Sequence, residues 1–205
     1  MAPAEKRLII SIKQVSKSYE QGKVKVNAVN DLSLGIEEGK FTALCGPSGS
    51  CKTTFLNMIG GLDLPTEGTI KLELQELAQL SSMALSYLRR EGVMSIFKQV
   101  GLQGLAILNV RRSAAIARAI VTHPAVVLAD EPTANVDSEN AEALLDLMEE
   151  LNQQEGITFI FSTHDPRVMK RASVMVSWIQ LRNYLAHVSW HGPGLKFERS
   201  LPKVN

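Results

Sequence analysis

A glycine-rich loop constrains this chain most, because it dictates what must precede and follow it. Residues 46–53 read Gly-Pro-Ser-Gly-Ser-Cys-Lys-Thr. A short apolar run, residues 40–45, enters the loop directly, and residues 53–59 have the apolar spacing of a helix that packs on a sheet. In the order strand, loop and helix, the backbone N–H groups of such a loop converge on phosphate oxygens at the helix N-terminus. The sequence therefore predicts a phosphate-binding loop.

Each chemical group in the loop has an expected task. Lys52 would neutralise the outer phosphates of a nucleotide, and the Thr53 hydroxyl would coordinate Mg²⁺. The predicted phosphate-binding residues are Gly46, Ser48, Gly49, Ser50, Cys51, Lys52, Thr53 and Thr54.

Cys51 departs from the pattern, because a glycine normally precedes the lysine and lets the backbone approach the phosphates. A side chain there is expected to weaken nucleotide binding or distort the loop. Small shifts of neighbouring residues could instead absorb the thiol. A redox-sensing thiol near a helix N-terminus is a third interpretation.

Two carboxylates follow a second apolar run. Residues 125–129 form a short continuous apolar stretch typical of a buried parallel strand, and Asp130 and Glu131 come directly after it. Ligands of open α/β sheets bind at the carboxyl ends of strands. We expect Asp130 to hold Mg²⁺ and Glu131 to act as general base on an attacking water. The alternative is a solvated pair that caps a helix.

His164 follows another apolar run, residues 157–161, and the turn-like pair Ser162-Thr163. It is therefore expected at the same edge of the sheet, where it could hydrogen-bond the terminal phosphate and the attacking water. A plain surface histidine is the alternative.

Short buried strands alternate with amphipathic helices along the chain. The predicted class is α/β, a mostly parallel sheet of the P-loop NTPase type flanked by helices, after a β-rich portion at residues 8–44. Further expected elements are strands at residues 68–72, 125–129 and 157–161 and helices at residues 74–90, 113–121 and about 138–156. The periodicity of residues 92–110 fits neither a helix nor a strand.

Composition limits the classes of partner that the chain can have. The 205 residues suit one domain, and 22 basic against 21 acidic residues leave a net charge of +1, which favours neither nucleic acid nor an anionic membrane. The two cysteines, Cys45 and Cys51, have no metal-ligand spacing and are interpreted as reduced thiols. Without a spanning apolar segment, the chain is expected to be soluble and to reach a membrane only through a partner.

Four segments together resemble the nucleotide-binding subunit of ABC transporters, in the branch that serves lipoprotein release and macrolide export. The resemblance covers residues 8–175 and rests on residues 46–54, 55–63, 128–137 and 162–165. It implies ATP and Mg²⁺ as cofactors, Glu131 and His164 as catalytic residues, and Tyr19 as the ring that stacks on adenine. It also implies that Asp137 communicates across a dimer.

The chain departs from this family at two places. The family's glutamine that faces the terminal phosphate should follow Phe97, but Lys98 stands there and Gln99 comes one position late. The resemblance implies that Gln99 takes this glutamine's place among the nucleotide-binding residues. Residues 109–113 stand where the family has its signature motif, and the helical subdomain is expected to be truncated around residues 98–113. The predicted organisation is a nucleotide-binding domain at residues 1–177 and a C-terminal appendage at residues 178–205.

The resemblance implies a cytoplasmic ATPase subunit that pairs with a second nucleotide-binding subunit, as a homodimer or heterodimer, and with a transmembrane permease. Because the signature completes the ATP site in trans, its loss is expected to impair turnover. The rival hypothesis is a non-hydrolysing, regulatory nucleotide-binding module. A small-molecule kinase is a third, weaker alternative, because it gives no reason for Asp130-Glu131 and residues 162–165 to occur together.

Overall fold

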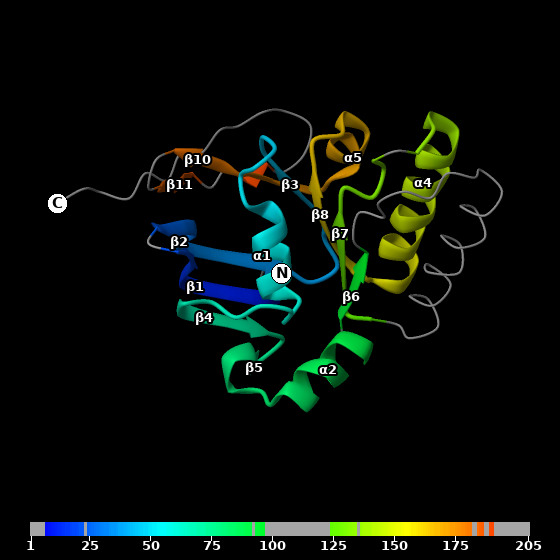
Figure 1. The fold of residues 1–205 in the computed structure, drawn as a ribbon. Helices are drawn as coiled ribbons and strands as arrows, with labels where there is room; N and C mark the ends of the chain where they lie inside the picture. The colour runs from blue at the N-terminus through cyan, green and yellow to red at the C-terminus, as the bar shows by residue number, and fades with distance from the viewer. Residues whose placement is uncertain are drawn as a thin grey trace, which may run out of the picture.

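A computed structural model describes residues 7–22, 24–91, 93–96, 124–134, 136–181, 184–186 and 189–190, which form two main sheets with a helix between them (Figure 1). The larger sheet has the order β12-β9-β3-β8-β7-β6. Its strands are β3 (Phe41–Cys45), β6 (Val93–Ile96), β7 (Val126–Asp130), β8 (Thr158–Thr163), β9 (Val174–Ser177) and β12 (Ser189–Trp190). All neighbours pair in parallel except β12, which runs antiparallel to β9.

The N-terminal portion forms a separate antiparallel sheet in the order β2-β1-β4-β5. Its strands are β1 (Leu8–Gln21), β2 (Val24–Glu37), β4 (Glu67–Leu72) and β5 (Gln75–Glu76). The prediction of a β-rich portion at residues 8–44 is confirmed, and the predicted α/β class with a mostly parallel sheet is confirmed with it.

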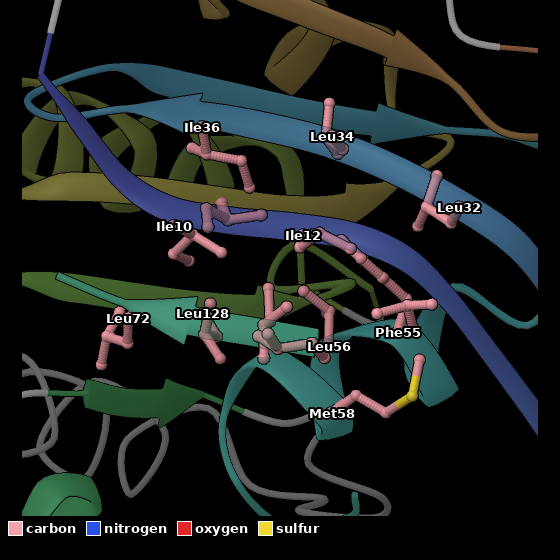
Figure 2. Packing of buried hydrophobic residues seen from close by; sticks show 14 of the residues in the cluster. Ile10, Ile12, Leu32, Leu34, Ile36, Phe55, Leu56, Met58, Leu72 and Leu128 are labelled. Atoms are coloured by element: carbon pink, nitrogen blue, oxygen red, sulfur yellow. The ribbon is translucent and has the colours of Figure 1, made fainter. Parts of the chain in front are cut away.

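Helix α1 (Lys52–Ile59) joins the two sheets through its apolar face. Phe55, Leu56 and Met58 are almost completely buried among side chains of β1, β2 and β4 on one side and of the parallel sheet on the other. Figure 2 shows this cluster, with Ile10, Ile12 and Leu32 of the antiparallel sheet facing the helix. Burial of α1 on both sides fixes the position of the glycine-rich loop that precedes it.

The opposite face of the parallel sheet is covered by α4 (Ser138–Glu155) and α5 (Pro166–Arg171). Leu145, Met148 and Leu151 of α4 pack on phenylalanines of the sheet, of which Phe41 and Phe161 have ring centroids 4.4 Å apart. Helix α4 begins and ends as predicted, because the Asp137 side chain accepts the N–H of Asn140 at 3.0 Å and Gly156 takes a left-handed φ of 69°.

One predicted helix is wrong in its first half. Residues 74–90 were expected to form one helix, but the chain forms β5, a 3-10 turn η1 (Leu77–Gln79) and only then α2 (Ser82–Glu91). Leu74, the first residue of the predicted helix, is 91% exposed. Helix α2 starts where the Ser81 hydroxyl accepts the N–H of Ala84 at 3.2 Å, as a helix-capping serine does.

The expectation of a surface appendage from residue 178 onward is wrong for Trp178 itself, which is 1% exposed. Beyond it, β10 (Ile179–Leu181) and β11 (Tyr184–Ala186) form a two-stranded antiparallel sheet, and β12 adds to the edge of the parallel sheet. The predicted helix at residues 113–121 and the predicted truncation around residues 98–113 lie outside the described residues. Within the described ranges, no helix combines the length and apolar character needed to cross a bilayer.

The packing of α4 predicts a contrast between two adjacent leucines. Leu145 is fully buried, whereas its neighbour Leu144 is only partly buried against the same cluster. We expect Leu145→Ala to lower the free energy of unfolding by about 3 kcal/mol, because it leaves a cavity in a packed interior. The matched variant Leu144→Ala should cost less than half as much in the same denaturant titration. Equal losses would contradict the burial of Leu145 against the sheet.

Candidate functional site

The glycine-rich loop spans the six residues between β3 and α1, at the carboxyl end of a parallel strand. Ser48 and Gly49 are exposed at its tip, and nothing lies within 4 Å of the position that a side chain at Gly49 would take. On the inner side, the Ser50 hydroxyl donates to the Pro47 carbonyl at 2.7 Å, which closes the turn. The loop is thus open on the side that a ligand would approach and packed on the other.

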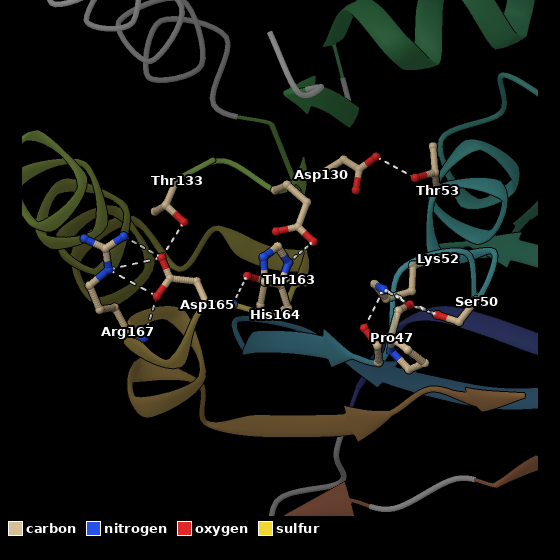
Figure 3. Close-up of polar contacts among 12 residues, drawn as sticks. Pro47, Ser50, Lys52, Thr53, Asp130, Thr133, Thr163, His164, Asp165 and Arg167 are labelled. Atoms are coloured by element: carbon tan, nitrogen blue, oxygen red, sulfur yellow. Dashed lines mark hydrogen bonds and ion pairs between the residues drawn. The ribbon is translucent and has the colours of Figure 1, made fainter. Parts of the chain in front are cut away.

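Lys52 is folded back onto its own loop. Its buried ammonium donates to the carbonyl oxygens of Gly46 at 2.8 Å and of Pro47 at 2.9 Å, and to the Ser50 hydroxyl at 3.3 Å (Figure 3). These carbonyls satisfy a buried cation in the way that phosphate oxygens could. The loop therefore surrounds the Lys52 ammonium with oxygen acceptors, which the phosphate oxygens of a nucleotide could replace.

Cys51 adopts a left-handed conformation, with φ 63° and ψ 24°, at the N-cap position of α1. This conformation costs a residue with a Cβ about 1–2 kcal/mol, whereas glycine adopts it freely. The sequence identified Cys51 as misplaced because its Cβ would crowd the phosphates. The structure adds a second reason, the strain of the backbone itself.

The acidic pair lies beside this loop, because β8 separates β3 from β7 and all three strands end at the same edge. The Thr53 hydroxyl donates to Asp130 Oδ2 at 2.7 Å (Figure 3). Asp130 is 8% exposed. A hydroxyl and a carboxylate in contact are the hard oxygen ligands that Mg²⁺ takes, with phosphate oxygens and water completing the shell.

That ligand set explains why no metal cluster needs to be preformed. The described residues contain no group of three histidine, cysteine or acidic side chains that could hold a metal ion. Mg²⁺ in nucleotide sites is held by one or two protein oxygens together with the phosphates. Thr53 and Asp130 therefore fit a magnesium nucleotide and would be its protein ligands.

Glu131 and His164 contact each other, as their predicted positions at neighbouring strand ends require. His164 Nδ1 lies 2.7 Å from Glu131 Oε1. The backbone of Glu131 is left-handed, with φ 48°, and its N–H donates to the Ser162 carbonyl at 2.9 Å. Strain of this kind persists where surrounding contacts impose it and is common at functional sites. The Glu131 side chain is 15% exposed and that of His164 is 77% exposed.

A third carboxylate, that of Asp165, connects the loops after β7 and β8, and the sequence analysis assigns it no role. The Asp165 carboxylate accepts from the Thr133 hydroxyl at 2.7 Å and from the Arg167 guanidinium at 2.7 Å. The hydrogen bond from Arg167 is the main reason why the pKa of Asp165 is lowered to about 2, so this carboxylate is charged at neutral pH. The available signal was Asp165 followed by proline, a typical start of a short helix.

Tyr19 lies near the start of α1, on the antiparallel sheet. Its hydroxyl donates to Asp63 Oδ2 at 2.7 Å, and the ammonium of Lys17 lies 5.0 Å from the centre of its ring. Burial is the main reason why the pKa of Tyr19 is raised, with further contributions from Asp63. Burial also raises the pKa of Asp63, but hydrogen bonds from Lys17 and Tyr19 outweigh it and leave that pKa below its usual value.

The predicted site residues are thus partly brought together. The loop residues, Asp130, Glu131 and His164 meet at one edge of the sheet, and Tyr19, which is 39% exposed as a residue, remains available for stacking. Gln99 lies outside the described residues. Assignment of these residues to nucleotide contacts stays a prediction.

Comparison with known proteins agrees with this geometry. The family model described as ABC transporter matches residues 29–106. The macrolide export ATP-binding/permease protein MacB of Bdellovibrio bacteriovorus is 32% identical over 210 residues, which cover 82% of this chain.

Solved structures match as well. A dimeric structure of MJ0796, described as a bacterial ABC transporter cassette, superposes with a TM-score of 0.73 at 28% identity, covering 82% of this chain and 94% of that one. The chain belongs to the ABC transporter family of nucleotide-binding domains. Another structure of MJ0796, bound to ADP and Pi, matches at 27% identity with the same coverage and TM-score.

Two further facts set the scope of the likeness. This ABC domain spans about a third of the length of the MacB relative, 32%. CbiO1 of Clostridium perfringens, part of the ABC transporter complex cbiONQ, matches with a TM-score of 0.67, covering 83% of this chain and 84% of that one. Because it is only 20% identical, this match shows the fold alone. ATP and Mg²⁺, the predicted cofactors, are those of this family.

The environment of Cys45 predicts a pH-dependent reactivity. Burial raises the pKa of this thiol to about 11, with a smaller opposing effect of Lys52. Because the thiolate is the nucleophile, Cys45 should hardly react with iodoacetamide at pH 8 and should react faster as the pH approaches 11. The Cys51→Ser variant leaves Cys45 as the only cysteine and allows labelling to be read by mass spectrometry. Labelling at pH 8 as fast as that of an unfolded control would contradict this environment.

Proposed function

We propose that this domain binds ATP with Mg²⁺ and hydrolyses it, and that it serves as the ATP-binding subunit of an export system. The observation that carries the proposal is the 2.7 Å hydrogen bond from Thr53 to Asp130. It places the loop that would hold the phosphates and the carboxylate that would hold the metal in direct contact. A phosphate loop without a nearby carboxylate could not supply both a hydroxyl and a carboxylate as ligands of one metal ion.

The tasks of the individual residues follow from their contacts. Lys52 would exchange the carbonyls of Gly46 and Pro47 for phosphate oxygens, and Thr53 and Asp130 would hold the metal. Bound Mg²⁺ would supply charge neutralisation at the transferring phosphate. Glu131 would orient and deprotonate the attacking water, and His164, 2.7 Å from it, would hold the Glu131 carboxylate and the terminal phosphate in register.

The ring of Tyr19 would supply the adenine platform. Its hydroxyl is held by Asp63 and one side of the ring faces Lys17, so the ring is already oriented before a base arrives. A fixed aromatic ring loses little conformational entropy when it stacks on a ligand.

Partners are proposed from the relatives. MacB is an ATP-binding/permease protein, and MJ0796 has been solved as a dimer. We infer that this domain acts at the cytoplasmic face of a membrane by pairing with a second nucleotide-binding domain and with a transmembrane permease. Export, as in the macrolide relative, is the proposed direction of transport.

A non-hydrolysing nucleotide-binding or regulatory module is the second candidate, and Cys51 favours it. Cys51 places a side chain at a left-handed position of the loop, and crowding or strain there would misplace the phosphates, whose positioning hydrolysis requires. The sequence departures at Lys98 and at residues 109–113 support the same candidate.

Glu131→Gln separates the two candidates. If Glu131 is the general base, the variant should bind ATP as the natural chain does but should lose about a hundredfold or more in steady-state hydrolysis. Glu139→Gln, at an exposed position in the first turn of α4, is the matched control and should retain full turnover. Binding of ATP without turnover by the natural chain at any protein concentration would establish the non-hydrolysing module. Equal turnover in both variants would overturn the role of Glu131.

A further inference from the structure

Among the side chains that the structure describes, Trp178 is the largest fully buried one, and it lies directly after β9. We propose that Trp178 is a positioning residue of the phosphate loop. Its indole N–H holds the Ser50–Cys51 peptide in the orientation that binds phosphate, and this makes a cysteine acceptable at position 51. The inference rests on the proposed binding of a nucleotide by this loop.

Trp178 contacts the loop at both of its ends. Its backbone N–H donates to the Cys45 carbonyl at 2.5 Å, and its indole Nε1–H donates to the Ser50 carbonyl at 2.5 Å. A side chain at Gly46 would collide with the Trp178 carbonyl, so the loop backbone rests directly on this residue.

The indole ring is itself held in place by helix α1. It packs on Phe55 with ring centroids 4.8 Å apart and an angle of 42° between the planes. Phe55 is fully buried between the two sheets. The hydrogen-bond donor therefore belongs to a side chain that cannot turn away without repacking the core.

The hydrogen bond to Ser50 determines the direction of the next N–H group. In a trans peptide the C=O and N–H point to opposite sides. Because the Ser50 carbonyl points toward the indole, the N–H of Cys51 points away from Trp178 and from the packed side of the loop. Backbone N–H groups that point to the open side are what a phosphate loop uses to bind its ligand.

The same peptide sets the strained conformation of Cys51. With φ 63° this residue occupies a region that a side chain disfavours by about fivefold or more relative to glycine. Rotation of the Ser50–Cys51 peptide would relieve the strain, and it would break the hydrogen bond from Trp178. The hydrogen bond from the indole thus restrains this peptide against rotation. With glycine at position 51 there is less strain, so the restraint matters less.

This relation predicts a coupling between positions 178 and 51. We would measure the dissociation constants of magnesium tripolyphosphate and of ATP for the natural chain, for Trp178→Phe, for Cys51→Gly and for the double variant. Trp178→Phe should weaken both ligands about tenfold when Cys51 is present, as expected for loss of a buried hydrogen bond together with loop rotation. With glycine at position 51 the same change should cost about twofold.

Tripolyphosphate lacks the base, so an equal loss for both ligands assigns the effect to the phosphate loop. Site-specific replacement of Trp178 by 3-benzothienylalanine keeps the fused ring and replaces the N–H with sulfur, which cannot donate, so it tests the same bond if Trp178→Phe folds poorly. The inference is overturned if either replacement leaves both dissociation constants unchanged. It is also overturned if the loss of affinity is the same in the natural chain and in the Cys51→Gly background. If the natural chain binds neither ligand, the proposed function fails and the inference fails with it.

Discussion

The hydrogen bond from Thr53 to Asp130 joins two segments that are 77 residues apart in sequence. It is possible only because β8 separates β3 from β7 and the three strands run parallel, so that their carboxyl ends share one edge. The groups proposed to contact the phosphates and the metal lie along this edge or on the helix that leaves it, whereas Tyr19 comes from the antiparallel sheet. The order of the strands is therefore the constraint on which the site depends.

The edge holds its charged groups in pairs before any ligand arrives. Lys52 is satisfied by carbonyl oxygens, Asp130 by the Thr53 hydroxyl, and Glu131 by His164. Asp165, the residue directly after His164, is held by Arg167 and Thr133. Buried or half-buried charges without partners would destabilise the fold. The contacts that stabilise the domain without ligand therefore also hold these groups where a nucleotide and its metal could replace their partners.

The sequence predicted the elements that are continuous and apolar. Residues 125–129 and 157–161 were recognised as buried strands, and the cap at Asp137 and the stop at Gly156 marked both ends of α4. The site residues on these strand ends followed directly, because parallel strands bring their carboxyl ends together. The resemblance to ABC domains added Tyr19, whose place beside α1 no periodicity could predict.

What the sequence missed has physical reasons. Leu77 and Leu80 match the helical spacing of Leu85 and Leu88 by chance, and the cap at Ser81 sets the true start of α2. The left-handed backbone of Cys51 and Glu131 depends on contacts from distant segments, which a local pattern does not contain. Trp178 stands in a stretch without clear period, and only its contacts with Ser50 and Phe55 show that it belongs to the core.

The most direct test of a shared metal and phosphate site is the effect of Mg²⁺ on ATP affinity. Isothermal titration of ATP into the natural chain, with Mg²⁺ or with excess EDTA, should show affinity tighter by about tenfold with the metal. Asp130→Asn removes the carboxylate that Thr53 contacts and should abolish most of this difference. An undiminished effect of Mg²⁺ in Asp130→Asn, or no ATP binding by the natural chain, would contradict the site as described.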